Sequence, residues 1–356
     1  MKRILSILTV ITLTTLLSTP CLMAGNDDRR GTAGAPELLI NPWARSSSWG
    51  GINTANGRGI DAFFTNVAGL SFVEKMEFVY TNTMYLGGKS GLVSGASINA
   101  FGLAVRLGES GVLGAYVMTM GFGDIDVTTE GSPEPGSNGT MAPNFMNLNL
   151  AYSHSFTNSI HGGGNIKIIT ESLSNVSATG VAIDAGIQYL TGENDELKFG
   201  IALKNIGPAM SFGGTGLSFT MTNQAGKPMT VEFRSAEMEL PTCLNIGASY
   251  DFFFEKWDQR LTLAANFTSN AFLRDNFGLG FEYSALNRFQ VRAAYVYQTD
   301  LLDGDNRTTV NAGLSAGASV EIPLKKDGGP SIALDYSYRS AYTMKGSHSI
   351  GATIKF

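Results

Sequence analysis

His348–Phe356 reads His-Ser-Ile-Gly-Ala-Thr-Ile-Lys-Phe, and two kinds of side chain alternate along it. The apolar positions are Ile350, Ala352, Ile354 and Phe356, and the small or polar positions between them are Ser349, Gly351, Thr353 and Lys355. A period of two is typical of a strand with one buried face. A large aromatic residue at the end of such a strand suits the membrane interface of a β-barrel better than the edge of a soluble sheet. The stretch therefore predicts a strand of a transmembrane barrel.

The same alternation recurs from Lys75 onward, in segments separated by turn residues. The predicted strands are Met76–Leu86, Ser94–Leu107, Val112–Thr128, Phe145–Phe156, Ile160–Ser172, Gly180–Leu190, Leu197–Asn205, Met238–Phe253, Arg260–Thr268, Phe277–Ser284, Phe289–Gln298, Thr309–Glu321, Ser331–Tyr342 and Ser347–Phe356. An even number of strands lets a single-chain barrel begin and end on the same side of the membrane. We therefore predict an all-β fold, a 14-stranded antiparallel transmembrane β-barrel.

In the clearest segments the charged residues share one face. A Lys or Arg on the lipid face at mid-membrane costs about 2–4 kcal/mol, so the charged faces are predicted to line the lumen. We expect these charges to pair with one another, or with Arg45, Arg58 and Asp61 further upstream, and to give a sealed, polar interior. The predicted lumen charges are Lys167, Asp184, Lys198, Lys204, Arg292 and Asp335.

The start of the chain has the pattern of a secretory signal. Basic residues precede an apolar run over Ile4–Leu17, and small residues follow up to Ala24. The run is too short for a membrane helix. Cys21 also allows a lipoprotein site, which the preceding Pro20 disfavours. After cleavage only Cys243 is left, so no disulfide framework is predicted.

The stretch Gly31–Leu70 has no clear period but is rich in aromatic residues. Trp43, Trp49, Phe63 and Phe64 argue against disorder, because a segment with such side chains buries them. An irregular stretch of this length is uncommon in a compact domain unless it has a function. We therefore predict a signal at 1–24, a leader and lumen plug at 25–72, and the barrel at 73–356.

The connections between predicted strands alternate between short and long, as in transmembrane barrels with short periplasmic turns and long outer loops. The longest, Gly207–Glu237, is rich in large apolar residues. Such a loop either forms a lid over the barrel mouth or docks a partner. The residues predicted to bind a partner are Phe212, Leu217, Phe219 and Met221.

The sequence predicts no enzyme. No nucleophile, base and orienting group occur together, and none of the three histidines has a Cys, Asp or Glu partner at ligand spacing. Asp300, Asp303 and Asp305 share a loop but lack the glutamate of a calcium loop, so a solvated loop is the better interpretation. The net charge of −5, with no basic patch, argues against nucleic acid. No metal or cofactor is expected.

Motifs in the predicted plug resemble a known family. Ala35-Pro36-Glu37-Leu38-Leu39-Ile40, Ala44-Arg45, Gly50-Gly51 and Asn66-Val67-Ala68-Gly69-Leu70 resemble the PorV/PorQ family of Bacteroidota outer-membrane proteins. That family is similar to the FadL long-chain fatty-acid transporters, which are barrels with an N-terminal hatch. Asn66 and Gly69 match the hatch motif Asn-Pro-Ala-Gly, with Val67 in place of proline. The resemblance implies plug or hatch roles for Arg45, Asn66 and Gly69.

The resemblance also implies a function in the cell outer membrane. The protein would be a component of the type IX protein secretion system that binds or shuttles the C-terminal domains of cargo. Its partners would be the large translocon barrel and the sortase or attachment complex, within outer-membrane lipid. The alternative is a FadL-like transporter of hydrophobic small molecules, which needs a continuous apolar pocket. A third possibility is a structural barrel that stabilises a neighbour.

Overall fold

The computed structural model describes residue 29 and residues 31–87, 96–286, 288–325 and 329–356. The predicted signal at 1–24 lies outside the described residues. In the part of the chain that is described, no helix is long and apolar enough to cross a membrane.

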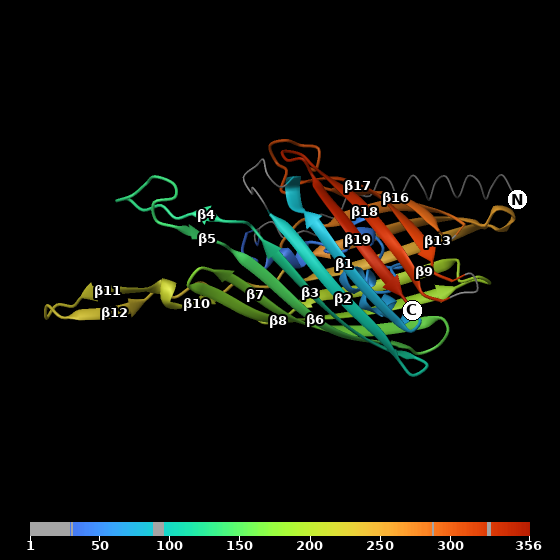
Figure 1. The fold of residues 1–356 in the computed structure, drawn as a ribbon, viewed down its shortest axis with the longest axis horizontal. Helices are drawn as coiled ribbons and strands as arrows, with labels where there is room; N and C mark the ends of the chain where they lie inside the picture. The colour runs from blue at the N-terminus through green and yellow to red at the C-terminus, as the bar shows by residue number, and fades with distance from the viewer. Residues whose placement is uncertain (1–28, 30, 88–95, 287, 326–328) are drawn as a thin grey trace, which may run out of the picture.

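An antiparallel sheet forms the body of the molecule (Figure 1). Its long strands are β1 (Met76–Met84), β2 (Ser97–Leu107), β3 (Gly111–Gly121), β6 (Asn144–Ser155), β7 (Ile160–Leu173), β8 (Val176–Thr191), β9 (Leu197–Ile206), β13 (Cys243–Phe254), β14 (Gln259–Asn270), β15 (Asn276–Ala285), β16 (Phe289–Gln298), β17 (Asn311–Pro323), β18 (Ser331–Ala341) and β19 (Ser347–Lys355). Each pairs with its neighbours in chain order, and β19 pairs with β1, so the sheet closes. The sheet has 15 strands in all, because the two-residue β10 (Phe212–Gly213) adds to β8. The predicted 14-stranded barrel is therefore confirmed.

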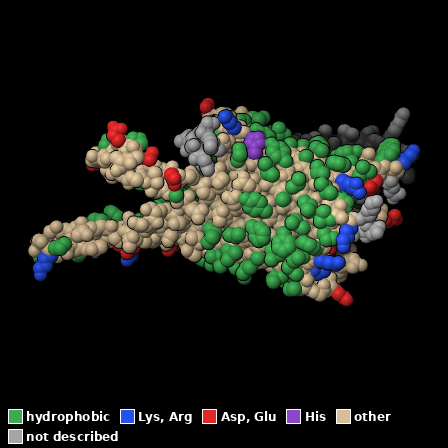
Figure 2. All heavy atoms as spheres, viewed as in Figure 1, with side chains coloured by type: hydrophobic (Ala, Val, Ile, Leu, Met, Phe, Trp, Pro, Cys, Tyr) green, Lys and Arg blue, Asp and Glu red, His purple; other side chains and the backbone are tan. Residues whose placement is uncertain are grey.

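The strands alternate between an outer apolar face and an inner small or polar face. On β19, Ile350 is 65% exposed whereas Ser349 is 3% exposed. On β8, Ile183 and Ile187 are exposed, whereas Asp184, which lies between them in the sequence, is buried. Figure 2 shows hydrophobic side chains gathered over the barrel wall. This apolar surface is what a lipid-facing wall requires.

The two ends of the barrel differ in their connections. One end carries the short turns 108–110, 156–159, 192–196, 255–258, 286–288 and 324–330, and the other carries the long connections 85–96, 122–143, 207–242 and 299–310. We call the second end the outer end, because transmembrane barrels have longer loops outside. The connections 271–275 and 342–346 at this end are short as well, and 174–175 is only a tight turn. There β7 and β8 themselves run further outward than predicted.

Three predicted strand boundaries are wrong by four residues or more. The third strand ends at Gly121 rather than Thr128, because Gly123 at φ +74° turns the chain out of the sheet. β8 begins at Val176 rather than Gly180, since its start pairs with β7 and β10. β13 begins at Cys243 rather than Met238, because Met238 pairs with Met210 instead.

Two arms project from the outer end (Figure 1). The first arm, 122–143, contains the short strands β4 (Ile125–Asp126) and β5 (Thr140–Met141). The second, 207–242, contains β10, the 3-10 helix η5 (Thr215–Leu217) and the hairpin β11 (Ser218–Thr222) and β12 (Pro228–Glu232). Other short helices follow barrel strands, namely η4 (Tyr85–Gly87) and η6 (Glu255–Trp257).

Residues 35–72, which we call the plug, lie inside the barrel. They form η2 (Pro36–Leu39), α2 (Ala44–Ser48), α3 (Ala62–Thr65) and η3 (Val67–Phe72). Trp43 and Phe63 are almost fully buried, and both rings meet Tyr116 of β3 edge-on, with ring centroids 5.3 and 5.0 Å away. The main apolar core of the described structure therefore lies between the plug and the inner face of the wall.

Candidate functional site

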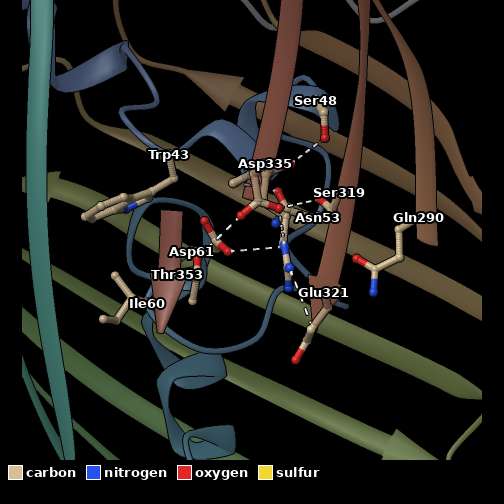
Figure 3. A network of polar contacts seen from close by, with 12 residues as sticks. Trp43, Ser48, Asn53, Ile60, Asp61, Gln290, Ser319, Glu321, Asp335 and Thr353 are labelled. Carbon is tan, nitrogen blue, oxygen red and sulfur yellow. Dashed lines mark hydrogen bonds and ion pairs between the residues drawn. The ribbon is translucent and has the colours of Figure 1, made fainter. Parts of the chain in front are cut away.

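Arg45 on α2 connects the plug to the wall through carboxylates. Its Nε lies 3.1 Å from Asp335 Oδ1 on β18 and 3.7 Å from Asp61 Oδ2 of the plug. Figure 3 labels both carboxylates. Its Nη2 lies 4.0 Å from Glu321 Oε2, which also meets Lys355 Nζ at 3.0 Å. The side chains of Asp61 and Asp335 are 6% and 3% exposed, so they depend on this guanidinium for charge compensation.

Asn66 joins the plug to the opposite wall through its carboxamide. Nδ2 donates to the carbonyl oxygens of Thr54 in the plug and Ile187 on β8, both at 3.0 Å. Oδ1 accepts from the Ala68 N–H at 3.1 Å. The side chain fits because the wall has Gly186 there, where a Cβ would lie 2.1 Å from Asn66 Oδ1.

Gly69 permits a close approach within the plug. A Cβ on this residue would lie 2.2 Å from the carbonyl oxygen of Gly57. The Gly59 N–H also donates to the Gly69 carbonyl oxygen at 2.9 Å. The family resemblance singled out Arg45, Asn66 and Gly69. In the structure these plug residues form ion pairs, form hydrogen bonds and permit a close backbone approach, respectively.

The six charges predicted for the lumen are all buried inside the barrel, and most have partners on neighbouring strands. Lys167 Nζ lies 2.7 Å from Asp184 Oδ2 and 2.6 Å from Asn205 Oδ1. Lys198 pairs with Asp251. The sequence prediction did not include Asp251, although the alternation along β13 places this residue on the inward face.

Arg292 also finds a partner that the sequence prediction missed. Its Nε lies 2.6 Å from Glu282 Oε2, directly across the β15–β16 pair. Arg58 was expected to pair with a lumen charge, but its guanidinium carbon lies 4.3 Å from the centre of the Phe72 ring. Lys204 lies with Nζ 3.7 Å from the centre of the Phe64 ring.

The residues predicted for partner binding occupy the second arm, in two environments. Phe212 is half-buried and packs on the cluster that contains Met210. Phe219 and Met221 lie on β11 directly opposite Val231 and Met229 of β12, so the four side chains share one face of the hairpin. Phe219 also stacks on Phe233 at 4.7 Å. Leu217 is half-exposed in η5. The hairpin projects away from the barrel mouth, which argues against the lid alternative (Figure 1).

An apolar cavity of about 500 Å³ lies between the plug and the outer end of the wall. Its apolar lining residues are Leu39, Ile40, Tyr85, Met120, Phe122, Phe145 and Leu273. The expectation of a polar interior throughout is therefore wrong for the outer end. The plug supplies the side chains of Leu39 and Ile40, whose position could not be predicted because the plug has no sequence period.

Glu37 is the one carboxylate that lines this outer cavity among the described residues. It is 1% exposed, and its carboxyl group lies beside that of Glu171 on β7. Burial, followed by the nearby carboxylate of Glu171, raises the pKa of Glu37 to about 8. The site therefore favours the uncharged, protonated form of the Glu37 side chain.

A polar chamber of about 190 Å³ adjoins the outer cavity. The two share lining residues, including Asn41, Leu273 and Arg339. Two further cavities, of about 120 and 680 Å³, lie toward the inner end and share Arg45 and Arg58. Among the described residues, none lines both one of these two outer cavities and one of these two inner cavities.

No protein-family model matches the sequence, and a comparison with curated proteins gives no match. Solved structures match the fold. The Ralstonia pickettii toluene transporter TbuX has a TM-score of 0.55 at 13% identity, over 88% of this chain and 97% of its own. The Pseudomonas putida toluene transporter TodX has a TM-score of 0.54 at 14% identity, over 88% and 97%. The CymD monoaromatic hydrocarbon channel has a TM-score of 0.52 at 13% identity, over 89% and 98%.

These similarities agree with the barrel described above. The chain is a closed, 14-stranded antiparallel β-barrel, and two toluene transporters and a monoaromatic hydrocarbon channel share its fold. At this level of identity, the likeness concerns the fold alone.

Proposed function

We propose that this protein is an outer-membrane channel or transporter for hydrophobic small molecules. The observation that carries the proposal is the apolar cavity of about 500 Å³ at the outer end. Cavities of this size with apolar and aromatic walls are typical of small-molecule sites. The similarity to two toluene transporters and a monoaromatic hydrocarbon channel supports the same class of substrate.

The position of the cavity supports uptake from outside. Its lining includes Thr83, Met120 and Phe145, which lie at the outer ends of β1, β3 and β6. A hydrophobic molecule that leaves water for this cavity gains about 25 cal/mol for each Å² of apolar surface buried. The plug and its ion pairs stand between the cavity and the inner end, so transport requires a movement of the plug or an exit through the wall.

Placing a charge in the cavity should block uptake. We expect Met120→Lys to slow toluene uptake into reconstituted vesicles by about tenfold or more, because a lysine puts a charged, hydrated side chain into a mainly apolar site. Leu302→Lys is the matched control, since Leu302 is 77% exposed on an outer loop and should leave uptake unchanged. If wild-type vesicles take up toluene no faster than empty vesicles, the proposed function is wrong.

We propose type IX secretion as a second candidate, in which the β11–β12 hairpin docks a cargo C-terminal domain, the translocon barrel or the attachment complex. The apolar face of this hairpin favours it, because Phe219, Met221 and Met229 are each more than 40% exposed. A two-stranded hairpin is marginally stable by itself, so a partner would stabilise it. A gentle detergent pull-down with mass spectrometry tests this. Recovery of the barrel without any secretion component would exclude this candidate.

A further inference from the structure

Two carboxyl groups are buried beside each other where the plug meets the wall. Glu37 of η2 is 1% exposed and Glu171 of β7 is 4% exposed. Among the described residues, no lysine, arginine or histidine acts on the charge of either group. By contrast, Asp184, Asp251 and Glu282 each form an ion pair with a lysine or an arginine. The Glu37–Glu171 pair therefore lacks the positive counterpart that these other interior carboxylates have.

Aromatic rings lie next to this pair, at the wall of the outer cavity. Phe145 is directly across from Glu171 in the register of β6 and β7, and both side chains are on the inward face. Phe122 meets Phe145 edge-on, with ring centroids 4.9 Å apart. Both rings line the cavity of about 500 Å³ that Glu37 also lines. Carboxylates and the faces of aromatic rings both attract cations, so this side of the cavity suits a positively charged organic group.

The other titratable groups of this cavity leave the Glu37 side open to a cation. Arg339 lines the cavity too, but it lies on β18, six places from β7 in the ring of fourteen strands and so on the nearly opposite wall. Burial raises the pKa of Tyr85 above its usual value, which keeps this phenol uncharged at pH 7. The apolar cluster around Leu38, which packs on η2, contributes no charge. A ligand with one positive end would therefore place that end at Glu37.

We propose that the outer cavity binds organic cations, with an ammonium group at the carboxyl groups of Glu37 and Glu171 and an apolar body against Phe122 and Phe145. The proposal rests on the proposed function, and it names the substrate class as hydrophobic amines. Two buried carboxyl groups side by side retain a proton, because two negative charges there would repel each other in an apolar site. The ammonium group supplies the missing positive charge, so its binding releases that proton to the solvent.

Three water-soluble probes with the same phenyl ring test the proposal, by isothermal titration of the purified, folded barrel at pH 8. Benzyltrimethylammonium is positively charged, benzyl alcohol is neutral and benzoate is negatively charged. We expect benzyltrimethylammonium to bind about tenfold or more tightly than either other probe, because only a cation gains from the carboxylates and the ring faces.

The pH dependence of binding tests the released proton. Benzyltrimethylammonium has no proton to lose, so any dependence comes from the protein. Burial and the neighbouring Glu171 raise the pKa of Glu37 to about 8. Since a bound cation favours the charged form of the pair, the affinity should rise by about tenfold from pH 6 to pH 8.

Combining Glu37→Gln with Glu171→Gln removes both acidic groups at nearly unchanged side-chain volume. This double variant should bind benzyltrimethylammonium no more tightly than benzyl alcohol, at pH 6 and at pH 8. Glu193→Gln, on an exposed inner turn, is the matched control and should bind as the wild type does. Heat-dependent migration in a detergent gel checks that every variant is a folded barrel. A double variant that still prefers the cation would overturn the inference, and so would a wild-type protein that lacks the preference or binds the cation equally at both pH values.

Toluene uptake by the wild-type protein separates the two proposals. Uptake of toluene without a preference for benzyltrimethylammonium overturns the cation site and leaves the transport function standing. Absence of toluene uptake overturns the transport function, whatever benzyltrimethylammonium does.

Discussion

Arg45→Met should destabilise the plugged barrel by about 3–5 kcal/mol, because it leaves buried carboxylates without their counter-charge. Asp61 and Asp335 are both nearly inaccessible to water, and Arg45 is the cation within 4.0 Å of each in the described structure. Because the lost ion pairs join the plug to the wall, the plug should leave the lumen more often. Denaturant unfolding measures the stability, and single-channel conductance in a planar bilayer measures the opening.

A compensating variant tests the cause. Adding Asp335→Asn to Arg45→Met removes one of the stranded charges and should recover part of the lost stability. Arg288→Met, at an inner turn of the wall, is the control for loss of an arginine and should change neither stability nor conductance. If Arg45→Met unfolds at the wild-type denaturant concentration and conducts no more current, the network does not hold the plug.

Asn66→Leu should cost about 3 kcal/mol, since it removes several buried hydrogen bonds at about 1 kcal/mol each and leaves polar groups without partners. The groups that lose a partner are the carbonyl oxygens of Thr54 and Ile187 and the N–H of Ala68. Leucine also has no room beside Gly186, where the Asn66 carboxamide already touches the wall. We expect a lower unfolding midpoint together with protease cleavage of the plug in the folded barrel.

Asn158→Leu provides the comparison, because Asn158 is exposed on an inner turn. This variant should keep the wild-type midpoint and a protected plug. An Asn66→Leu protein as stable as Asn158→Leu, with its plug equally protected, would show that Asn66 is not an anchor.

Much of the barrel follows from local sequence. Alternation in segments such as His348–Phe356 determines which face meets lipid, because successive side chains of a strand point to opposite sides. The same rule predicted that Lys167, Lys198 and Arg292 face the interior, where they are buried. Strand ends were less predictable, since β8 extends beyond Gly180 to Val176 through pairing with β7 and β10.

The candidate site depends on contacts that no local pattern contains. Whether an inward lysine is paired is decided by the strand across from it. Lys167 forms an ion pair with Asp184 on β8, whereas Lys204 lies against Phe64 of the plug and forms no ion pair with another described residue. The apolar face of the second arm likewise depends on the register that sets Met221 against Met229.

The sequence by itself determined the barrel and its inward faces, because both follow from a period of two along each strand. The tertiary structure decided where the plug leaves space. The apolar cavity exists because Leu39 and Ile40 of the plug face Met120 and Phe145 of the wall, about 80 to 106 positions away in sequence. Cavities and unpaired charges arise where distant segments meet, and a one-dimensional pattern carries no such distances.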